Sequence, residues 1–224
     1  MTEDIKKIMG EIGFNAKAAC AKLSTASDDE KNDALHLMAD RIDRNKEYIL
    51  SENKKDIQIA KSNSLSAAMI DRLSINDLGI KNIASSMRDI AKLNDPVGRE
   101  LESWDRPNGL HIKKISIPIG VIGIIYESRP NVTADAASLC LKSGNTSILR
   151  SGSDSYFSSY AIYESIKEGL NQTSLDSNAI QLVPSKDRDA VGLMLGGLDS
   201  SIDIIVPRGG KSLVSRVQSE AKVP

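Results

Sequence analysis

Apolar residues recur every three or four positions through the first hundred residues, which predicts amphipathic helices. Ser27 and Glu30 have the spacing of a capping box, a signal for the start of a helix. The apolar stripes cover residues 5–23, 35–49, 66–73 and 75–93. We expect four helices here that pack together and against a neighbouring layer.

The pattern changes between residues 95 and 118, where prolines, glycines and alternating residues replace the helical spacing. Residues 111–117 alternate as a half-buried strand does, and Pro107-Asn108-Gly109 before them favours a turn. Residues 101–118 are therefore expected to form a hairpin or a linker strand.

From residue 119 onward, short apolar runs alternate with helical patterns, which is typical of a doubly wound parallel sheet with helices on both faces. The predicted strands are residues 121–126, 146–149, 179–183 and 202–206, and the predicted helices are residues 132–142, 153–170, 187–195 and one beginning near Gly210. We expect an α/β fold, with residues 1–100 as a helical part packed on the core and residues 119–224 as a Rossmann-like cofactor-binding domain. Ligands bind such sheets beyond the carboxyl ends of the strands, which here are Tyr126, Arg150, Pro184 and Pro207.

The composition is that of an ordinary globular protein and narrows the range of partners. The chain has 224 residues, 40% of them hydrophobic, with 29 Lys and Arg against 30 Asp and Glu. Without an excess of positive charge, nucleic acid is not an expected partner. The first residues lack a secretory pattern, and no apolar run reaches the roughly 20 residues that span a bilayer. We expect a cytoplasmic protein without a membrane partner.

Cys20 and Cys140 are the only cysteines of the sequence, and neither lies near further cysteine or histidine ligands. Neither a disulfide framework nor a metal site is expected. Cys140 lies among alanines and leucines in a helix predicted to be buried, where a free cysteine behaves as a small hydrophobe. Cys20 lies in the first helix without a nearby base. We expect neither thiol to be a catalytic nucleophile.

Three strand-to-helix junctions carry the polar residues that candidate chemistry needs. The first contains Arg129, which serves there equally well in a structural salt bridge or as a ligand contact. At the second, Arg150 is placed to meet a phosphate or ribose, and Ser153 is expected to be an N-cap. At the third, Gly209 and Gly210 let the backbone approach a ligand, and the following helix offers unpaired amides to an anion.

Two common nucleotide-binding motifs are excluded. Gly210-Lys211-Ser212 resembles the end of a P-loop, but that motif needs a glycine where the sequence has Ile205. The sequence also lacks a G-x-G-x-x-G fingerprint. The residues alone thus indicate an anion-binding, doubly wound α/β domain.

Several segments, in one order, resemble gamma-glutamyl phosphate reductase, also called glutamate-5-semialdehyde dehydrogenase, a family of the aldehyde dehydrogenase superfamily. They are PIGVIGIIYESRPNVT (residues 118–133), LCLKSGN (139–145), ILRSGS (148–153) and IDIIVPRGGKSL (202–213), with DRL (71–73) and DPVG (95–98) matching the N-terminal part. The resemblance covers nearly the whole chain.

The resemblance implies NADPH as cofactor and gamma-glutamyl phosphate as a small-molecule substrate in proline biosynthesis. Arg150 stands where superfamily members have a lysine that contacts the adenosine ribose, and an arginine suits the added phosphate of NADPH. The implied cofactor-binding residues are Tyr126, Glu127, Arg150, Ser153, Ser185, Arg208, Gly209 and Gly210, and the implied substrate-binding residues are Ser128, Arg129 and Asn131. Glu127 and Ser128 replace the usual Trp-Asn, so the amide that normally donates to the oxyanion has no clear equivalent, and Asn131 is a weak substitute.

In the family's chemistry, as the resemblance implies it, a cysteine thiolate displaces phosphate from the substrate and NADPH delivers hydride to the thioester. Family members run to nearly twice this length, and the nucleophilic cysteine is expected beyond Pro224. We therefore expect this chain alone to be inactive and the full-length enzyme to be a homo-oligomer. We also expect an exposed apolar surface beside the cleft, where a catalytic domain would pack.

Two alternatives stay open at this point. A non-catalytic nucleotide-binding or regulatory protein with the same fold would carry the same residues up to Pro224. A different acyl-phosphate or aldehyde reductase is disfavoured by residues 126–131, which resemble the glutamyl phosphate branch.

Overall fold

The computed structural model describes residues 3–224, and within them five helices precede the first strand. They are α1 (Glu3–Leu23), α2 (Asp28–Arg44), α3 (Lys46–Ser62), α4 (Ala67–Leu73) and α5 (Asp77–Ala91). The capping box is confirmed, since Ser27 and Glu30 exchange side-chain-to-backbone hydrogen bonds. The prediction of one helix over residues 35–49 was wrong, because the chain turns at Asn45, which ends α2 and precedes α3. Asparagine favours such helix ends because its side chain competes with helical hydrogen bonds.

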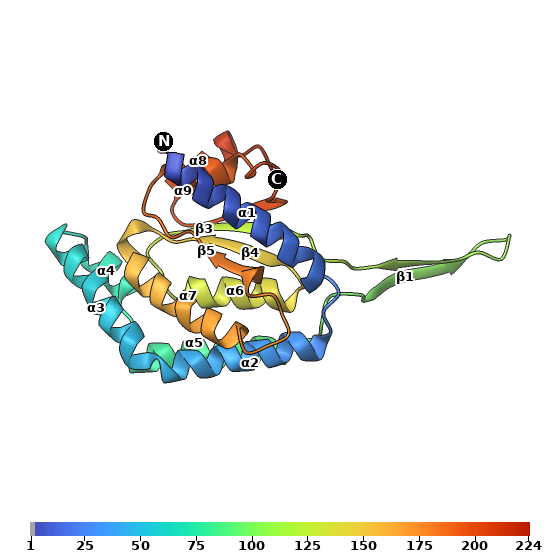
Figure 1. The fold of residues 1–224 in the computed structure, drawn as a ribbon, viewed down its shortest axis with the longest axis horizontal. Coiled ribbons are helices and arrows are strands. Elements are labelled where there is room, and N and C mark those ends of the chain that lie inside the picture. The colour runs from blue at the N-terminus through green and yellow to red at the C-terminus, as the bar shows by residue number, and fades with distance from the viewer. Residues whose placement is uncertain (1–2) are drawn as a thin grey trace.

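The hairpin alternative for the middle segment is confirmed. β1 (Glu100–Asp105) and β2 (His111–Ile115) pair in antiparallel fashion. The Arg106 N–H donates to the Leu110 carbonyl (2.9 Å), and Gly109 has a φ of +85°, in the region that favours glycine. The hairpin projects from the body of the molecule as a long arm (Figure 1).

Within the described residues, four parallel strands form the main sheet, in the order β5-β4-β3-β6. The strands are β3 (Val121–Tyr126), β4 (Thr146–Arg150), β5 (Ile180–Leu182) and β6 (Ile204–Arg208). The other elements are the helices α6 (Val132–Lys142), α7 (Tyr156–Leu170), α8 (Asp189–Leu195) and α9 (Lys211–Glu220), with the short turns η1 (Ser153–Ser155) and η2 (Ser177–Ala179). The predicted doubly wound α/β fold is confirmed.

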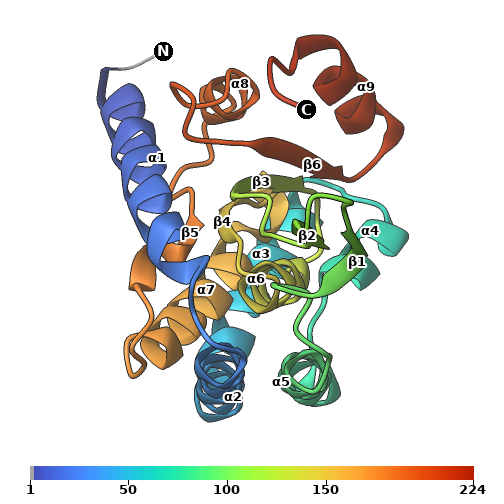
Figure 2. The same cartoon turned by 90° about the vertical axis from the view of Figure 1, so that its right-hand side faces the viewer.

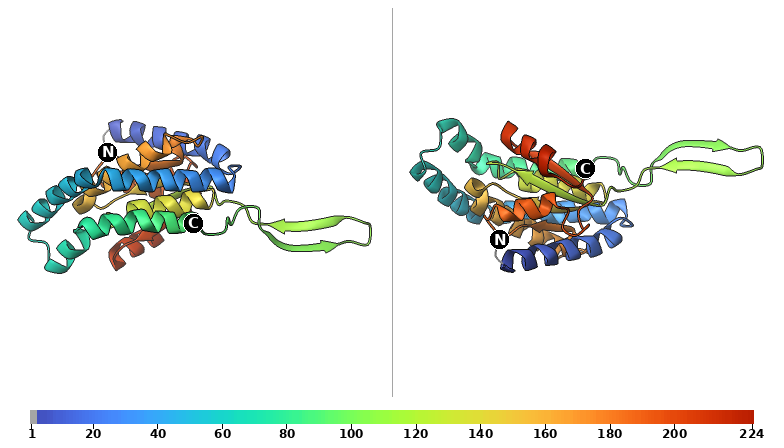
Figure 3. Two further views of the ribbon diagram at one scale, coloured as in Figure 1. Left: turned by 90° about the horizontal axis from the view of Figure 1, so that it is seen from below. Right: turned by 90° about the horizontal axis from the view of Figure 1, so that it is seen from above.

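The sheet is buried between two apolar cores because successive side chains of a strand point to opposite faces. From β3, Ile122 and Ile124 enter the core that contains α2, α5, α6 and α7. Val121 and Ile125 enter the core that contains α1 and α8. Figure 2 shows these helices on opposite sides of the sheet, and Figure 3 shows α2 and α5 side by side. The N-terminal helices are therefore part of the cores that cover the sheet.

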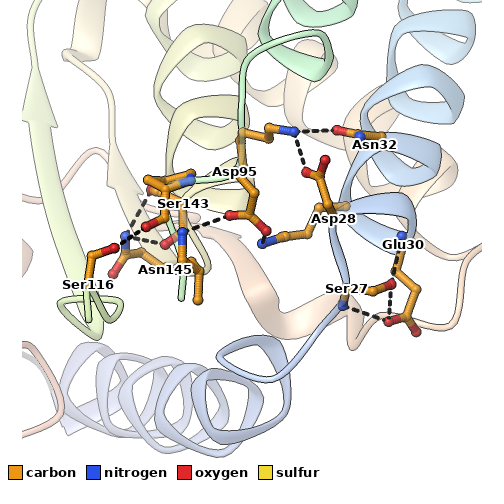
Figure 4. Close-up of polar contacts among 12 residues, drawn as sticks. Ser27, Asp28, Glu30, Asn32, Asp95, Ser116, Ser143 and Asn145 are labelled. Atoms are coloured by element: carbon orange, nitrogen blue, oxygen red, sulfur yellow. Dashed lines mark hydrogen bonds and ion pairs between the residues drawn. The ribbon is translucent and has the colours of Figure 1, made fainter. Parts of the chain in front are cut away.

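A buried polar network joins α2 to the ends of α5 and α6 near the root of the hairpin (Figure 4). Nζ of Lys31, whose side chain is 1% exposed, lies 2.5 Å from the carboxylate of Asp95. Nζ of Lys142 donates to Asp28 and to the side-chain oxygen of Asn32 (2.7 Å), both on α2. A buried ammonium group needs such acceptors, so these contacts specify how α2 packs on its neighbours.

Among the described residues, the largest group of exposed apolar side chains lies on the hairpin and its connections, whereas the sequence led us to expect it beside the cleft, where Met69 is exposed. The large exposed side chains of the hairpin and its connections are Leu101, Trp104, Leu110, Ile115, Ile117 and Ile119. The hairpin stands clear of both helix layers, so nothing within the described residues covers these side chains. None of the described helices combines the length and the apolar character needed to cross a membrane.

The Lys31–Asp95 pair provides a test of stability. Asp95→Ala should lower the free energy of unfolding by about 3 kcal/mol, because it leaves a buried ammonium group without its carboxylate. Adding Lys31→Met should restore most of that loss, since methionine fills a similar volume without a charge. Urea denaturation followed by circular dichroism measures both values. A double variant that is no more stable than Asp95→Ala would show that the buried charge is not the cause.

Candidate functional site

Three adjoining cavities lie at the carboxyl edge of the sheet and form one cleft. The β4 cavity (about 430 Å³) is lined by the ends of β3 and β4 and by α8 and α9. The β6 cavity (about 450 Å³) is lined by the residues that follow β3 and β6, and the α6 cavity (about 410 Å³) by α5 and the start of α6. The first two share Met69, Glu127 and Ser128, and the last two share Arg72. The cleft is therefore at the edge where the sequence predicted a site.

The cleft brings together all but one of the residues that the sequence singled out. The β4 cavity is lined by Tyr126, Glu127, Ser128, Arg150 and Ser153, and the β6 cavity by Glu127, Ser128, Arg129, Arg208, Gly209 and Gly210. Asn131 lines the α6 cavity. Ser185 lines none of the three, and its hydroxyl instead accepts a hydrogen bond from the Asp187 N–H (3.1 Å) in the loop before α8.

One hydrogen bond joins the loop after β3 to the start of α9. The Gly210 N–H donates to Oε2 of Glu127 (2.7 Å), and α9 has no side-chain cap from its own N-cap residue. A methyl group on Gly209 would lie 2.6 Å from the same oxygen, so a side chain at this position would displace the Glu127 carboxylate. The carboxylate therefore occupies a helix N-terminus, which is a position that favours anionic groups such as phosphate.

The loop after β3 is strained where it meets the loop after β4. Ser128 has a φ of +33°, outside the conformations that residues with a side chain normally adopt. A methyl group on Gly152 would lie 3.2 Å from the Ser128 backbone nitrogen, so the two loops are in close contact. Strain of this kind gathers at functional sites, where the surrounding fold maintains it. Here the fold holds Ser128 at the junction of the β4 and β6 cavities.

Arg150 ends β4 and is buried beside the β4 cavity. Its guanidinium group donates to the carbonyls of Ser151 (2.6 Å), Lys186 (3.2 Å) and Asp187 (3.4 Å). Its Nε is buried without a hydrogen-bond partner in the described part of the chain. Burial lowers the pKa of Arg150, and the nearby positive charge of Arg188 lowers it further. A buried guanidinium with an unused donor is suited to an anionic oxygen.

Three further cations line the β4 cavity, and the sequence reasoning had missed them. They are Lys186, Arg188 and Arg216. Nζ of Lys186 lies 4.9 Å from the ring centre of Tyr156 and 4.4 Å from that of Phe157, within the range of cation–π contacts. The closeness of Lys186 and Arg188 to the end of a predicted strand was an available signal. Together with Arg150 these groups outnumber the carboxylates of the lining, Glu127 and Asp154, and make the cavity positive.

The sequence predicted that Ser153 caps the helix that follows it, and this prediction was wrong. Ser153 begins η1, and its hydroxyl lies 3.5 Å from the Asp154 carboxylate. The capping acceptor of α7 is Asp56 of α3, which accepts from the N–H groups of Phe157 (3.2 Å) and Ser158 (2.7 Å). Asp56 comes 101 residues before Phe157, so the local sequence gives no sign of it.

The α6 cavity is polar and contains a carboxylate. Nδ2 of Asn131 donates to Asp135 (2.9 Å) one turn along the chain. Burial raises the pKa of Asp135, and the positive charge of Arg208 acts in the opposite direction. The side chains of Asn76 and Asn82 complete the polar lining. This part of the cleft thus differs in charge from the cation-rich β4 cavity.

A larger cavity of about 540 Å³ lies outside this cleft, between α1, α7 and β5. Its charged lining consists of Glu11, Glu164 and Glu168 with Lys167 as the one cation among the described residues. An excess of carboxylates disfavours an anionic ligand. The cleft at the strand ends is therefore the better candidate for a phosphate-bearing cofactor.

Neither of the two thiols lines the cleft. Cys140 is buried in α6, as predicted, and burial raises the pKa of its thiol to about 12. A thiol in that state is protonated at neutral pH and is a poor nucleophile. Cys20 is half-buried on α1.

Comparison with curated proteins finds close relatives. The chain is 55% identical over 224 residues to the gamma-glutamyl phosphate reductase of Brucella suis biovar 1 (strain 1330), covering 100% of this chain and 53% of that protein. It is 56% identical over 221 residues to the protein of the same name from Rhizobium johnstonii, covering 99% of this chain and 52% of that protein. No family model matches the chain. The chain spans about half the length of the curated relatives it matches.

Solved structures show the same likeness. The gamma-glutamyl phosphate reductase of Thermotoga maritima superposes with a TM-score of 0.94 at 38% identity, over 96% of this chain and 52% of that one. The Saccharomyces cerevisiae protein of that name superposes with a TM-score of 0.88 at 30% identity, over 96% of this chain and 54% of that one. A probable aldehyde dehydrogenase from Listeria monocytogenes, 12% identical with a TM-score of 0.75, shares the fold.

The two thiols provide a test of the structure that needs no ligand. At pH 8 only Cys20 should react quickly with Ellman's reagent, because Cys140 is buried and protonated. In guanidinium chloride both thiols should react. Cys20→Ser should abolish the fast reaction and Cys140→Ser should leave it unchanged. A fast reaction in the folded Cys20→Ser variant would contradict the buried position of Cys140.

Proposed function

We propose that this chain, which by sequence and fold belongs to the gamma-glutamyl phosphate reductase family, forms the cofactor-binding side of the enzyme's active site. The proposed reaction is the NADPH-dependent reduction of gamma-glutamyl phosphate to glutamate 5-semialdehyde, a step of proline biosynthesis. The observation that carries the proposal is the cation-rich β4 cavity with Arg150 buried beside it. Because the chain spans about half the length of its relatives, the reaction is proposed for the whole enzyme.

The residues of the β4 cavity fit NADPH. The unused Nε of Arg150 and the ammonium group of Lys186 are suited to the phosphate on the adenosine ribose. The N-terminus of α9 offers backbone amides to the pyrophosphate if the Glu127 carboxylate turns away. Val191 and Leu213 provide an apolar lining suited to the adenine ring.

Bound NADPH would supply the hydride, and the residues of this chain would position the two reactants. Ser128 lies where the β4 and β6 cavities meet, and its strained backbone fixes the loop between them. Asn131 is the candidate oxyanion donor, but its Nδ2 donates a hydrogen bond to Asp135 in the α6 cavity. This hydrogen bond argues against Asn131 as the oxyanion donor. We place the nucleophilic cysteine outside this chain, because Cys140 is buried and Cys20 does not line the cleft.

Cofactor preference tests the role of Arg150. Arg150→Ala should weaken NADPH binding more than NADH binding by roughly 1–3 kcal/mol, the contribution of a charge-assisted hydrogen bond. Arg150→Lys, which keeps the charge, should retain part of the preference. Nucleotide fluorescence titration gives both affinities, and thermal melts show whether each variant is folded. An equal loss for both cofactors would mean that Arg150 acts only through the backbone carbonyls that it holds.

The carboxylate at the start of α9 gives a second prediction. Glu127→Gln should tighten NADPH binding by about 1 kcal/mol, because the amide oxygen still accepts from Gly210 but no longer repels the pyrophosphate. Glu100→Gln in the exposed hairpin is the matched control and should leave the affinity unchanged. The same fluorescence titration measures the effect. Unchanged or weaker binding in Glu127→Gln would place the pyrophosphate elsewhere.

A further inference from the structure

Three arginines line the β6 cavity. Arg72 comes from α4, Arg129 from the loop after β3, and Arg208 from the end of β6. Within residues 3–224, none of the three guanidinium groups makes an ion pair or a hydrogen bond. All three side chains are exposed, so water screens their mutual repulsion in the free chain, and an anion bound between them would be attracted by all three.

The carboxylates nearby balance only part of this charge. Glu127 lines the β6 cavity and supplies one negative charge against the three arginines, and its Oε2 accepts the hydrogen bond from Gly210. Asp135 senses the charge of Arg208 but lines the neighbouring α6 cavity, where Asn131 donates to it. The β6 cavity therefore keeps three donors of planar, bidentate geometry for an external anion.

The position of Arg72 extends the site. Arg72 lines both the β6 and the α6 cavity. One ligand can therefore extend from the arginines of the β6 cavity to the carboxylate of Asp135 in the α6 cavity. An amino acid whose side-chain carboxyl group is joined to phosphate has a matching order of charges: a phosphate at one end, then an uncharged chain, then a carboxylate and an ammonium group. The two cavities present arginines and then a carboxylate in the same order.

We infer that Arg129 and Arg208 receive the phosphate of an amino acid that is phosphorylated on its side-chain carboxyl group, that Arg72 receives its α-carboxylate, and that Asp135 receives its α-ammonium group. This inference rests on the proposed function and assigns the residues that recognise its substrate. The sequence had assigned Arg208 to cofactor binding, and this inference assigns it to substrate binding instead. It also gives α4, which lies far from the strands in sequence, a role in specificity.

The cofactor has a separate set of cations, which is why the β6 cavity is assigned to the substrate. Arg150, Lys186 and Arg188 all line the β4 cavity and none of them lines the β6 cavity. The two sets meet only at Met69, Glu127 and Ser128. Two anions can therefore bind side by side, as a reaction between a substrate and a dinucleotide requires.

Calorimetric titration with a stable substrate analogue tests the inference. The probe is the ketophosphonate in which CH2 replaces the anhydride oxygen of gamma-glutamyl phosphate, added to the chain in the presence and absence of NADPH. Arg72→Gln, Arg129→Gln and Arg208→Gln should each weaken its binding at least about fivefold, while Arg106→Gln in the hairpin turn leaves it unchanged. Asp135→Asn should weaken the ketophosphonate but not inorganic phosphate, which has no ammonium group.

The outcomes separate this inference from the proposed function. Failure of the wild-type chain to bind the ketophosphonate while it binds NADPH would overturn the inference alone. The inference would also be overturned if all three arginine variants lost less than about twofold in affinity for the ketophosphonate. It would likewise be overturned if they lost as much affinity for NADPH as for the ketophosphonate. Arginine-dependent binding of the ketophosphonate without any binding of NADPH would support the inference and contradict the proposed cofactor role. Thermal melts confirm that each variant is folded, and Arg208→Lys, which retains the charge, should recover part of the affinity.

Discussion

Burial of the parallel sheet on both faces is the constraint on which the cleft depends. Every residue of β3 and β4 is buried, so these strands can present polar side chains only where they end. Since all four strands run in the same direction, their carboxyl ends meet at one edge. The residues there, Glu127, Arg150 and Arg208, are brought together by topology rather than by closeness in sequence.

Contacts between distant segments then fix the loops at that edge. Glu127 ties the loop after β3 to α9, Asp56 of α3 caps α7, and Arg150 holds the loop before α8 by its carbonyls. Two of these contacts use groups that also suit a phosphate: the amide at the start of α9 and the guanidinium of Arg150. The protein thus holds these groups in place with its own carboxylate and carbonyls, and an anionic ligand would have to compete with them.

The sequence predicted β3 and α6 at the residues where they occur, because their apolar runs and helical spacing are strong local signals. It did not predict the break at Asn45, since the residues on both sides of it face one core and the apolar spacing continues through two helices. The error at Ser153 has a different cause, because the acceptor that caps α7 comes from another helix. The position of Arg72 in the cleft was hidden in the same way, since only packing brings α4 to the strand ends. The local sequence pattern therefore predicted most of the helices and strands. Contacts between distant segments decide which polar groups meet, and the local pattern does not contain them.

The most direct test of the cleft is an NMR titration of the 15N-labelled chain with NADPH. We predict the largest amide shifts in the loop after β4 and at the start of α9, around Gly152 and Gly210, where the β4 cavity meets the helix N-terminus. Shifts centred instead on Glu11 and Lys167, which line the larger cavity between α1 and α7, would contradict the assignment of the cofactor to the carboxyl edge of the sheet.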